Sequence, residues 1–327
     1  GSFRVNEVRT GDQERPQVGV LRDGGAVFVW QGGTSGSQRI YARFMGPDGT
    51  FITGDLQVNT YADTFQQDPS VACLDDGTVV VVWASYGQDS DGRDSGTKAD
   101  RLLGVFGQRL SASGEPLGDE FQVNQSWINN QRSPTVAALD GNKYVVAWIT
   151  ESYSGLTMQV DEGGQPLESG SGIKLYDVVA CGRVFDASLG AITDEVVLTP
   201  SGLVAANPAV ARSSEGGFAL AWSGRGAPIA SGDESSGQGW DIYGASYDSS
   251  GSLIGVPGRL NTYTTGDQYV PRIAPVANQS LVVWTSLGQD GSHEGVFGRV
   301  LETHGPVGDE MQVNTFARSQ QLYPTVS

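Results

Sequence analysis

A proline followed about fourteen residues later by a tryptophan recurs five times, and this interval constrains the fold more than any other feature of the chain. The intervals are 14, 14, 14, 14 and 13 residues, and successive prolines, counting a sixth at Pro324, lie 53, 65, 74, 63 and 53 residues apart. Periods of this length indicate propellers, solenoids or arrays. The pairs are Pro16 and Trp30, Pro69 and Trp83, Pro134 and Trp148, Pro208 and Trp222, and Pro271 and Trp284.

Two amide residues keep the same register. An Asn lies ten positions before the proline and a Gln three positions before it in every copy except the fourth, where Leu198 and Ala205 stand instead. The fourth copy is therefore the degenerate one. The amides are Asn6, Asn59, Asn124, Asn261 and Asn314, with Gln13, Gln66, Gln131, Gln268 and Gln321.

Each copy contains four short segments typical of strands. In the second copy these are residues 69–74, 79–83, 104–110 and 121–124, and an Asp-Asp-Gly turn separates the first two. The segments are rich in β-branched and aromatic residues and are too short for typical helices. The pattern predicts four antiparallel strands per copy, with the proline at the start of the first strand, where no ladder donor is needed.

One such sheet buries too little apolar surface to be stable alone, so the copies must stack, with the repeated tryptophan as the filler between them. Radial stacking predicts an all-β fold, a β-propeller of four-stranded antiparallel blades in a single domain over residues 1–327. The expected repeats are 3–55, 56–120, 121–195, 196–258 and 259–310, with a partial copy at 311–327. Trp30, Trp83, Trp148, Trp222 and Trp284 are expected to be structural.

The two ends carry half-repeats. Residues 3–6 match a fourth strand and residues 324–327 match a first strand. We expect them to belong to one closing blade whose middle strands lie beyond Ser327 or are absent. A five-bladed ring with spare ends, or an open segment of a longer array, are the alternatives.

Charge and hydropathy exclude several classes of protein. The formal net charge is −17, from 20 Lys and Arg against 37 Asp and Glu, which argues against nucleic acid and anionic membrane surfaces as partners. The longest apolar run, residues 79–84, is far shorter than a membrane span, so no membrane insertion is expected. Cys73 and Cys181 are expected to be free thiols.

No catalytic motif is present in the sequence. The two histidines, His293 and His304, lie in different loops, and there is no nucleophile elbow, phosphate-binding loop or zinc-binding helix motif. We therefore expect no enzymatic activity. A pair of carboxylates in one acidic cleft could still serve a glycoside hydrolase, which stays as a less favoured alternative.

Insertions cluster between the second and third strands, at residues 84–103, 149–175 and 223–241. In repeat proteins such a face is often the binding surface. Tyr86, Tyr153 and Trp240 are the candidate ligand-binding residues, unless these rings only pin the loops to the sheet edge. In the first insertion Asp89, Asp91 and Asp94 are candidate ligands for Ca²⁺, which prefers oxygen donors.

Several phrases give the chain a family resemblance. Residues 87–89, 288–291, 295–298, 104–109, 305–308 and 121–124 read Gly-Gln-Asp, Gly-Gln-Asp-Gly, Gly-Val-Phe-Gly, Gly-Val-Phe-Gly-Gln-Arg, Gly-Pro-Val-Gly and Phe-Gln-Val-Asn. They resemble the tandem repeats of large bacterial secreted and surface proteins, including RTX-like adhesins. The resemblance covers nearly the whole chain and implies export and, with it, calcium. It brings no catalytic residues.

These observations favour a non-enzymatic extracellular or cell-surface module that binds a glycan or a protein through its insertion face. The alternative is a structural unit that self-associates through its terminal edge strands, residues 3–6 and 324–327.

Overall fold

The computed structural model describes residues 2–89, 102–127, 130–157, 173–188, 190–226 and 239–327. Of residues 153–157 and 173–176 it describes the backbone alone. This part of the chain forms 21 strands. No α-helix occurs among these residues, and accordingly none that could span a membrane.

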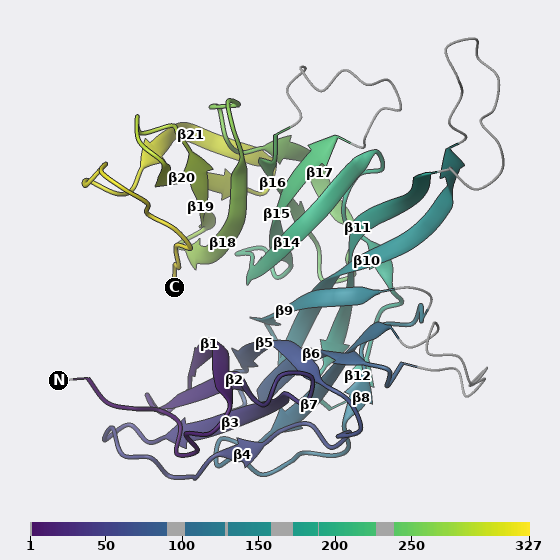
Figure 1. Ribbon diagram of the computed structural model, residues 1–327, viewed down its shortest axis with the longest axis vertical. Helices are drawn as coiled ribbons and strands as arrows, with labels where there is room; N and C mark the ends of the chain where they lie inside the picture. Colours follow the sequence, from purple (N-terminus) through teal and green to yellow (C-terminus); the bar gives the residue numbers. More distant parts are fainter. Residues whose placement is uncertain (1, 90–101, 128–129, 158–172, 189, 227–238) are drawn as a thin grey trace.

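The strands make five antiparallel sheets, each built from consecutive strands (Figure 1). Four sheets have four strands, and the third has five, because β12 and β13 both pair with β11. Blades 1 and 2 comprise β1 (Asp12–Val20), β2 (Ala26–Gly33), β3 (Arg39–Met45) and β4 (Leu56–Gln57), then β5 (Gln66–Cys73), β6 (Val79–Tyr86), β7 (Leu103–Leu110) and β8 (Phe121–Gln122).

The other three blades follow in chain order. Blade 3 comprises β9 (Gln131–Leu139), β10 (Lys143–Thr157), β11 (Ile173–Asp186), β12 (Gly190–Ala191) and β13 (Val196–Val197). Blade 4 comprises β14 (Leu203–Arg212), β15 (Phe218–Gly226), β16 (Asp241–Tyr247) and β17 (Leu253–Arg259). Blade 5 comprises β18 (Gln268–Val276), β19 (Gln279–Leu287), β20 (Glu294–Glu302) and β21 (Gly305–Gln312).

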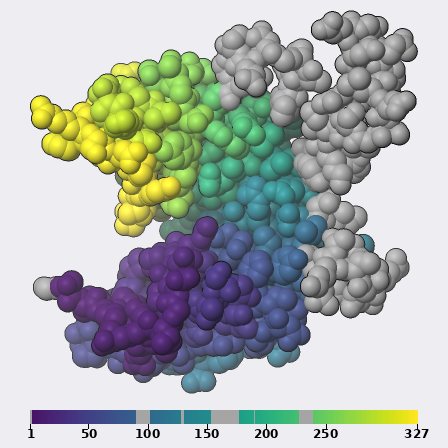
Figure 2. All heavy atoms as spheres, in the orientation of Figure 1, coloured from purple at the N-terminus to yellow at the C-terminus, as the bar shows by residue number. Residues whose placement is uncertain are grey.

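Successive blades pack around a common axis through their first strands, β1 against β5, β5 against β9, β9 against β14 and β14 against β18. The arrangement is a β-propeller, as the repeat predicts. The blades form an arc, and blades 1 and 5 face each other across an open cleft (Figures 1 and 2). The expected closing blade is not formed, because no strand is present in residues 2–11 or 313–327.

The repeated tryptophans fill the spaces between blades, as expected. Trp83, Trp148, Trp222 and Trp284 are fully buried, each in an apolar cluster shared with the preceding blade. Trp30 belongs to none of these clusters; it stacks on Tyr41 with ring centroids 6.0 Å apart. The difference arises because no blade precedes the first one in the arc.

The repeated proline lies inside the first strand, so the prediction that it begins the strand is wrong. The strand starts three or four residues earlier in most blades, and its register shifts at the proline. The residue before each proline adopts a left-handed backbone, with φ of 51° at Arg15, 57° at Asp68 and 53° at Ser133. The proline marks a β-bulge, a position where no ladder hydrogen bond is required.

The repeated Asn ties the fourth strand to the third strand of the same blade. Asn59 Oδ1 accepts the Ile40 backbone N–H at 2.8 Å, and Asn59 Nδ2 donates to Gln66 Oε1 at 2.9 Å. In the fourth copy Thr199 takes this role, since its Oγ1 accepts the Ala180 N–H at 3.0 Å. The sequence alignment that placed Leu198 opposite the Asn was therefore shifted by one residue.

The two cysteines are free thiols, as expected. Burial raises the pKa of Cys73 to about 11 and that of Cys181 to about 12. Cys73 packs close to Gly19 of the neighbouring blade, where an added Cβ would lie 2.7 Å from its sulfur atom. Both thiols therefore act as small apolar groups in the packing between blades.

Candidate functional site

The bulges of the first strands place a residue with a left-handed backbone conformation at the same inner position of every blade. Glycine normally occupies such conformations, because other side chains are strained there by about 1–3 kcal/mol. The residues at this position differ in chemistry from blade to blade, whereas the proline after them is constant. They are Arg15, Asp68, Ser133, Asn207 and Val270, with φ of 51–57°.

In the first three blades these inner strands carry charge. Arg15 Nη1 of blade 1 lies 2.5 Å from Asp68 Oδ1 of blade 2. In blade 3, Arg132 Nε on the inner strand β9 lies 2.6 Å from Glu151 Oε1 on the adjacent strand β10. We call Glu14, Arg15, Asp68, Arg132 and Glu151 the inner-strand cluster.

Hydrogen bonds through Gln31 connect Glu14 to Asp68. Gln31 is buried, its Nε2 donates to Glu14 Oε2 at 2.8 Å, and its Oε1 accepts the Asp68 backbone N–H at 3.0 Å. This amide therefore fixes the bulge of β5 relative to blade 1. It also holds the Glu14 carboxylate near the backbone N–H of Asp68.

Asp68 is the most enclosed acid of the inner-strand cluster. Its side chain is 12% exposed, against 63% for Arg15 and 25% for Glu151. Burial raises the pKa of Asp68 above its ordinary value, and the positive charges of Arg15 and Arg132 oppose this shift without cancelling it. A carboxyl group with a raised pKa retains its proton closer to neutral pH, as a general acid requires.

Glu151 has a different environment. Its Oε1 faces the Arg132 guanidinium and its Oε2 accepts a hydrogen bond from Asn130 Nδ2 at 3.0 Å. These two contacts hold the Glu151 carboxylate in one orientation. Carboxyl groups in contrasting environments are the usual basis for dividing the acid and base roles of one site.

The inner-strand cluster was not predicted from the sequence. Its members come from three blades, and no local motif connects residues so far apart in the chain. A usable signal was present in the position before each proline, which varies among charged, polar and apolar residues. A variable position inside a constant repeat is where a propeller can place function without losing the fold.

The aromatic residues expected to bind ligand lie on three different blades. Tyr86 is half-buried and stacks on Phe65, with ring centroids 5.0 Å apart. Tyr153 pairs with Tyr176 across β10 and β11, and its side chain lies outside the described part of the structure. Tyr86 of β6 and Trp240, which directly precedes β16, therefore belong to different blades.

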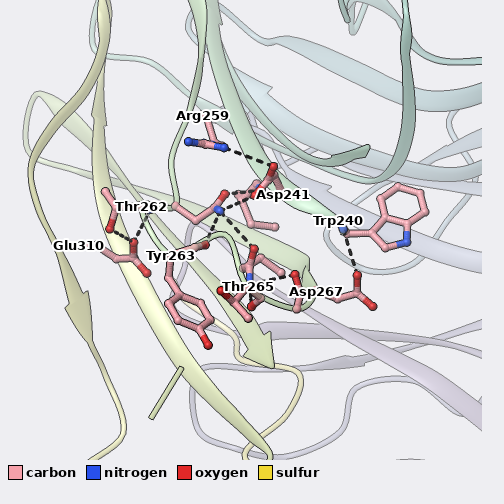
Figure 3. A network of polar contacts seen from close by, with 12 residues as sticks. Trp240, Asp241, Arg259, Thr262, Tyr263, Thr265, Asp267 and Glu310 are labelled. Carbon is pink, nitrogen blue, oxygen red and sulfur yellow. Dashed lines mark hydrogen bonds and ion pairs between the residues drawn. The ribbon is translucent and has the colours of Figure 1, made fainter. Parts of the chain in front are cut away.

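Trp240 belongs to a polar network at the junction of blades 4 and 5 (Figure 3). Its backbone N–H donates to Asp267 Oδ1 at 3.0 Å, and the Arg225 guanidinium lies 4.8 Å from its ring centroid. In the same network the Glu310 carboxylate accepts the backbone N–H and the hydroxyl of Thr262 at 2.5 and 2.6 Å. These contacts join blades 4 and 5, so Trp240 lies among residues that hold the two blades together.

Of the three acids expected to bind calcium, Asp89 alone is described, since Asp91 and Asp94 lie in residues 90–101. Asp89 is buried beneath Gly104 and accepts a hydrogen bond from Asn124 Nδ2 at 2.7 Å. Burial raises its pKa. Within the described ranges no group of three His, Cys, Asp or Glu residues could hold a metal ion.

Comparisons with known proteins identify the fold. No family model and no curated protein sequence matches the chain. A protein of unknown function from Dyadobacter fermentans shares 10% identity and a TM-score of 0.55, with 95% of this chain and 85% of that chain covered.

Two structures of carbohydrate-active enzymes share the same architecture. An ulvan lyase from a new polysaccharide lyase family has 9% identity and a TM-score of 0.54, covering 91% of this chain and 69% of its own. An α-L-arabinanase from Penicillium chrysogenum has 11% identity and a TM-score of 0.54, covering 96% and 84%. At these identities the shared property is the fold.

These comparisons overturn the prediction of a non-enzymatic adhesion or assembly module. Propellers of this architecture include a polysaccharide lyase and an arabinanase, so the absence of a catalytic motif did not justify excluding an enzyme. The physical reason is that a propeller can assemble an acidic site from inner strands of separate blades. Such a site leaves no local pattern in the sequence.

Proposed function

We propose that the protein is a carbohydrate-active enzyme that cleaves a glycan bound at the inner-strand cluster. The observation that carries the proposal is Asp68, a largely enclosed carboxyl group with a raised pKa at the inner bulge of blade 2, beside Arg15 of blade 1. The fold likeness to a polysaccharide lyase and an α-L-arabinanase supports the same class of substrate.

In this proposal the two carboxyl groups have separate roles. Asp68 donates a proton to the glycosidic oxygen as the bond to the leaving sugar breaks, because its raised pKa preserves the protonated form. Glu151, held by Arg132 and Asn130, acts as the carboxylate that activates water or stabilises the developing positive charge on the sugar ring. Arg15, largely exposed, offers N–H donors to sugar hydroxyl or carboxylate oxygens.

The test is cleavage of a panel of neutral and acidic polysaccharides. Release of reducing ends measures any cleavage, and the ultraviolet absorbance of an unsaturated sugar product distinguishes elimination from hydrolysis. We expect Asp68→Asn to lower kcat roughly 100-fold or more while the variant stays folded. The matched control is Asp75→Asn, an exposed turn residue outside the cluster, which should keep wild-type turnover.

Two results would contradict the proposal. One is a folded wild-type protein that cleaves no member of the panel. The other is an Asp68→Asn variant with wild-type kcat, which would mean that Asp68 only supports the packing between blades 1 and 2.

We propose further that the protein acts outside the cell. The resemblance of its repeats to those of secreted bacterial proteins supports this location, as does the polysaccharide substrate. Fractionation of the native host, with activity recovered in the medium or at the cell surface, is the direct test. Activity confined to the cytoplasmic fraction would contradict it.

A further inference from the structure

An open cleft separates blades 1 and 5 (Figure 2). The chain segment on each side of the cleft makes hydrogen bonds of the kind that join adjacent blades elsewhere. On the blade 1 side, Arg43 Nη1 donates to the Val5 backbone oxygen at 2.5 Å. Elsewhere the corresponding arginine of the third strand donates to a residue that follows the fourth strand of the preceding blade. These bonds join Arg183 to Val123 at 2.9 Å and Arg299 to Leu260 at 3.1 Å.

A second contact on this side follows the same rule. Asp55 accepts the backbone N–H groups of Glu7 and Val8, both at 2.9 Å. The corresponding acid of a later blade accepts N–H groups from the blade before it, as Glu195 does from Gln125 at 2.7 Å. Residues 5–8 therefore occupy the place of the end of a fourth strand, although the structure contains no blade before blade 1.

On the blade 5 side, residues 321–324 occupy the place of a first strand. The Gln321 N–H donates to the Glu294 backbone oxygen at 2.9 Å, as the Gln268 N–H does to Trp240 at 2.7 Å. Tyr323, which precedes Pro324, has a φ of 54°. The segment thus reproduces the bulge of the other five first strands and lies against β19, where the Tyr323 N–H donates to Thr285 Oγ1 at 3.2 Å.

The apolar side chains that face the cleft are uncovered. Val313 is 50% exposed, whereas the residues at the same position of the other four blades are 0–5% exposed and pack on the following blade. Val18, on the inner strand of blade 1, is 61% exposed, whereas its counterpart Val136 in blade 3 is 7% exposed. The buried counterparts of Val313 are Val58, Val123, Leu198 and Leu260.

We propose that this cleft binds an unpaired β-hairpin with the second-strand and third-strand pattern of the repeat, from a polypeptide segment outside residues 1–327. The hairpin would complete a sixth blade whose first strand is residues 321–327 and whose fourth strand is residues 3–6. One strand of the hairpin would take the place of a third strand. Asn6 lies where it would accept a backbone N–H from that strand, as Asn59 accepts the Ile40 N–H at 2.8 Å. The tryptophan of the hairpin would pack against Val313.

A second copy of the chain is a poor source of this hairpin. Each of its second and third strands is already paired with a first and a fourth strand in its own blade. The occupant therefore needs an unpaired hairpin. The two sets of contacts at the cleft specify its strand order and direction.

The experiment uses a synthetic peptide with the sequence of residues 277–303, which contains β19, β20 and their short turn. We expect saturable one-to-one binding to the full chain by calorimetry, together with slower amide hydrogen exchange in residues 3–8 and 321–327. A scrambled peptide should not bind. Val313→Asp should weaken binding roughly tenfold or more, because a carboxylate would be buried against the hairpin. The matched control, Val256→Asp, is 74% exposed on β17 and should bind as wild type.

If the synthetic peptide aggregates, the melting temperature of a fusion protein provides a second measurement. In a fusion that continues from Ser327 through a short turn into the sequence of residues 277–303, the melting temperature should rise relative to a scrambled fusion. Equal melting of the two fusions, or equal affinity of Val313→Asp and Val256→Asp, would overturn the proposal. So would a dimer of the unmodified chain in light scattering with residues 3–8 and 321–327 protected, since a second copy would then cover the cleft.

Discussion

Arg15 and Asp68 form an ion pair across the junction of the first two blades, with Nη1 and Oδ1 2.5 Å apart. Both residues have a left-handed backbone and both precede the repeated proline. The pair therefore exists because two equivalent bulges meet at the inner edge of the arc. The same geometry that packs the two blades together also brings a largely enclosed acid beside a cation.

The first prediction concerns pH. Because burial raises the pKa of Asp68 above 3.8, the native state binds more protons than the unfolded state between these two pKa values. The contribution of Asp68 to stability is therefore present at low pH and declines as the pH rises through the native pKa. The free energy of unfolding of wild type minus that of Asp68→Asn should fall from low to neutral pH in urea titrations. A difference that rises with pH would mean that the Arg15 pair dominates.

The second prediction compares two tryptophans at the same repeat position. Trp83→Ala should lower the free energy of unfolding by about 3–5 kcal/mol, since Trp83 is fully buried between blades 1 and 2. Trp30→Ala should cost less, because no preceding blade packs on it. Urea unfolding of the two variants is the measurement. Equal losses would show that contacts within a blade, and not between blades, stabilise these residues.

The third prediction concerns the acids that join adjacent blades. Glu120 accepts the Thr60 backbone N–H at 2.6 Å and the Thr60 hydroxyl at 3.0 Å. Glu120→Ala should reduce the free energy of unfolding by about 1 kcal/mol, a modest loss because the site is exposed to solvent. Glu115→Ala, in an exposed turn of the same blade, is the control and should melt as wild type. Indistinguishable melting of both variants would refute the role.

The fourth prediction concerns backbone strain. Val270 has a φ of 53°, a conformation unfavourable for a β-branched residue. Val270→Asn should raise the free energy of unfolding by about 1 kcal/mol, because Asn tolerates this region better. Val276→Asn, at a half-exposed position of the same strand, should change little. A loss of stability in Val270→Asn would mean that apolar packing at this bulge outweighs the strain.

Much of the fold could be predicted from residue spacing. The period of the prolines and tryptophans indicated four-stranded blades and radial stacking, and the buried tryptophans Trp83, Trp148, Trp222 and Trp284 bear this out. The bulge was missed, because a proline is compatible both with a strand start and with an interruption of the ladder. The role of Thr199 was also missed, because one residue fewer separates it from Pro208 than separates each Asn from its proline.

The candidate site was not predictable in the same way. Glu14, Asp68 and Glu151 are distributed over three blades, and each stands beside unremarkable neighbours in the sequence. Tyr86 and Trp240 were predicted to bind ligand because the long segments that contain them break the repeat. In the structure Tyr86 stacks on Phe65, and Trp240 lies in a network that joins two blades.

The repeating unit is evident from the sequence alone, because strand patterning and the proline-to-tryptophan interval are local properties that each copy carries. The packing of the blades places the residue before each proline at the inner edge of the arc, where the charges of Arg15 and Arg132 act on Asp68. The same packing leaves the arc open between blades 1 and 5. Both properties depend on how blades pack, and packing joins residues 50 or more positions apart, such as Arg15 and Asp68.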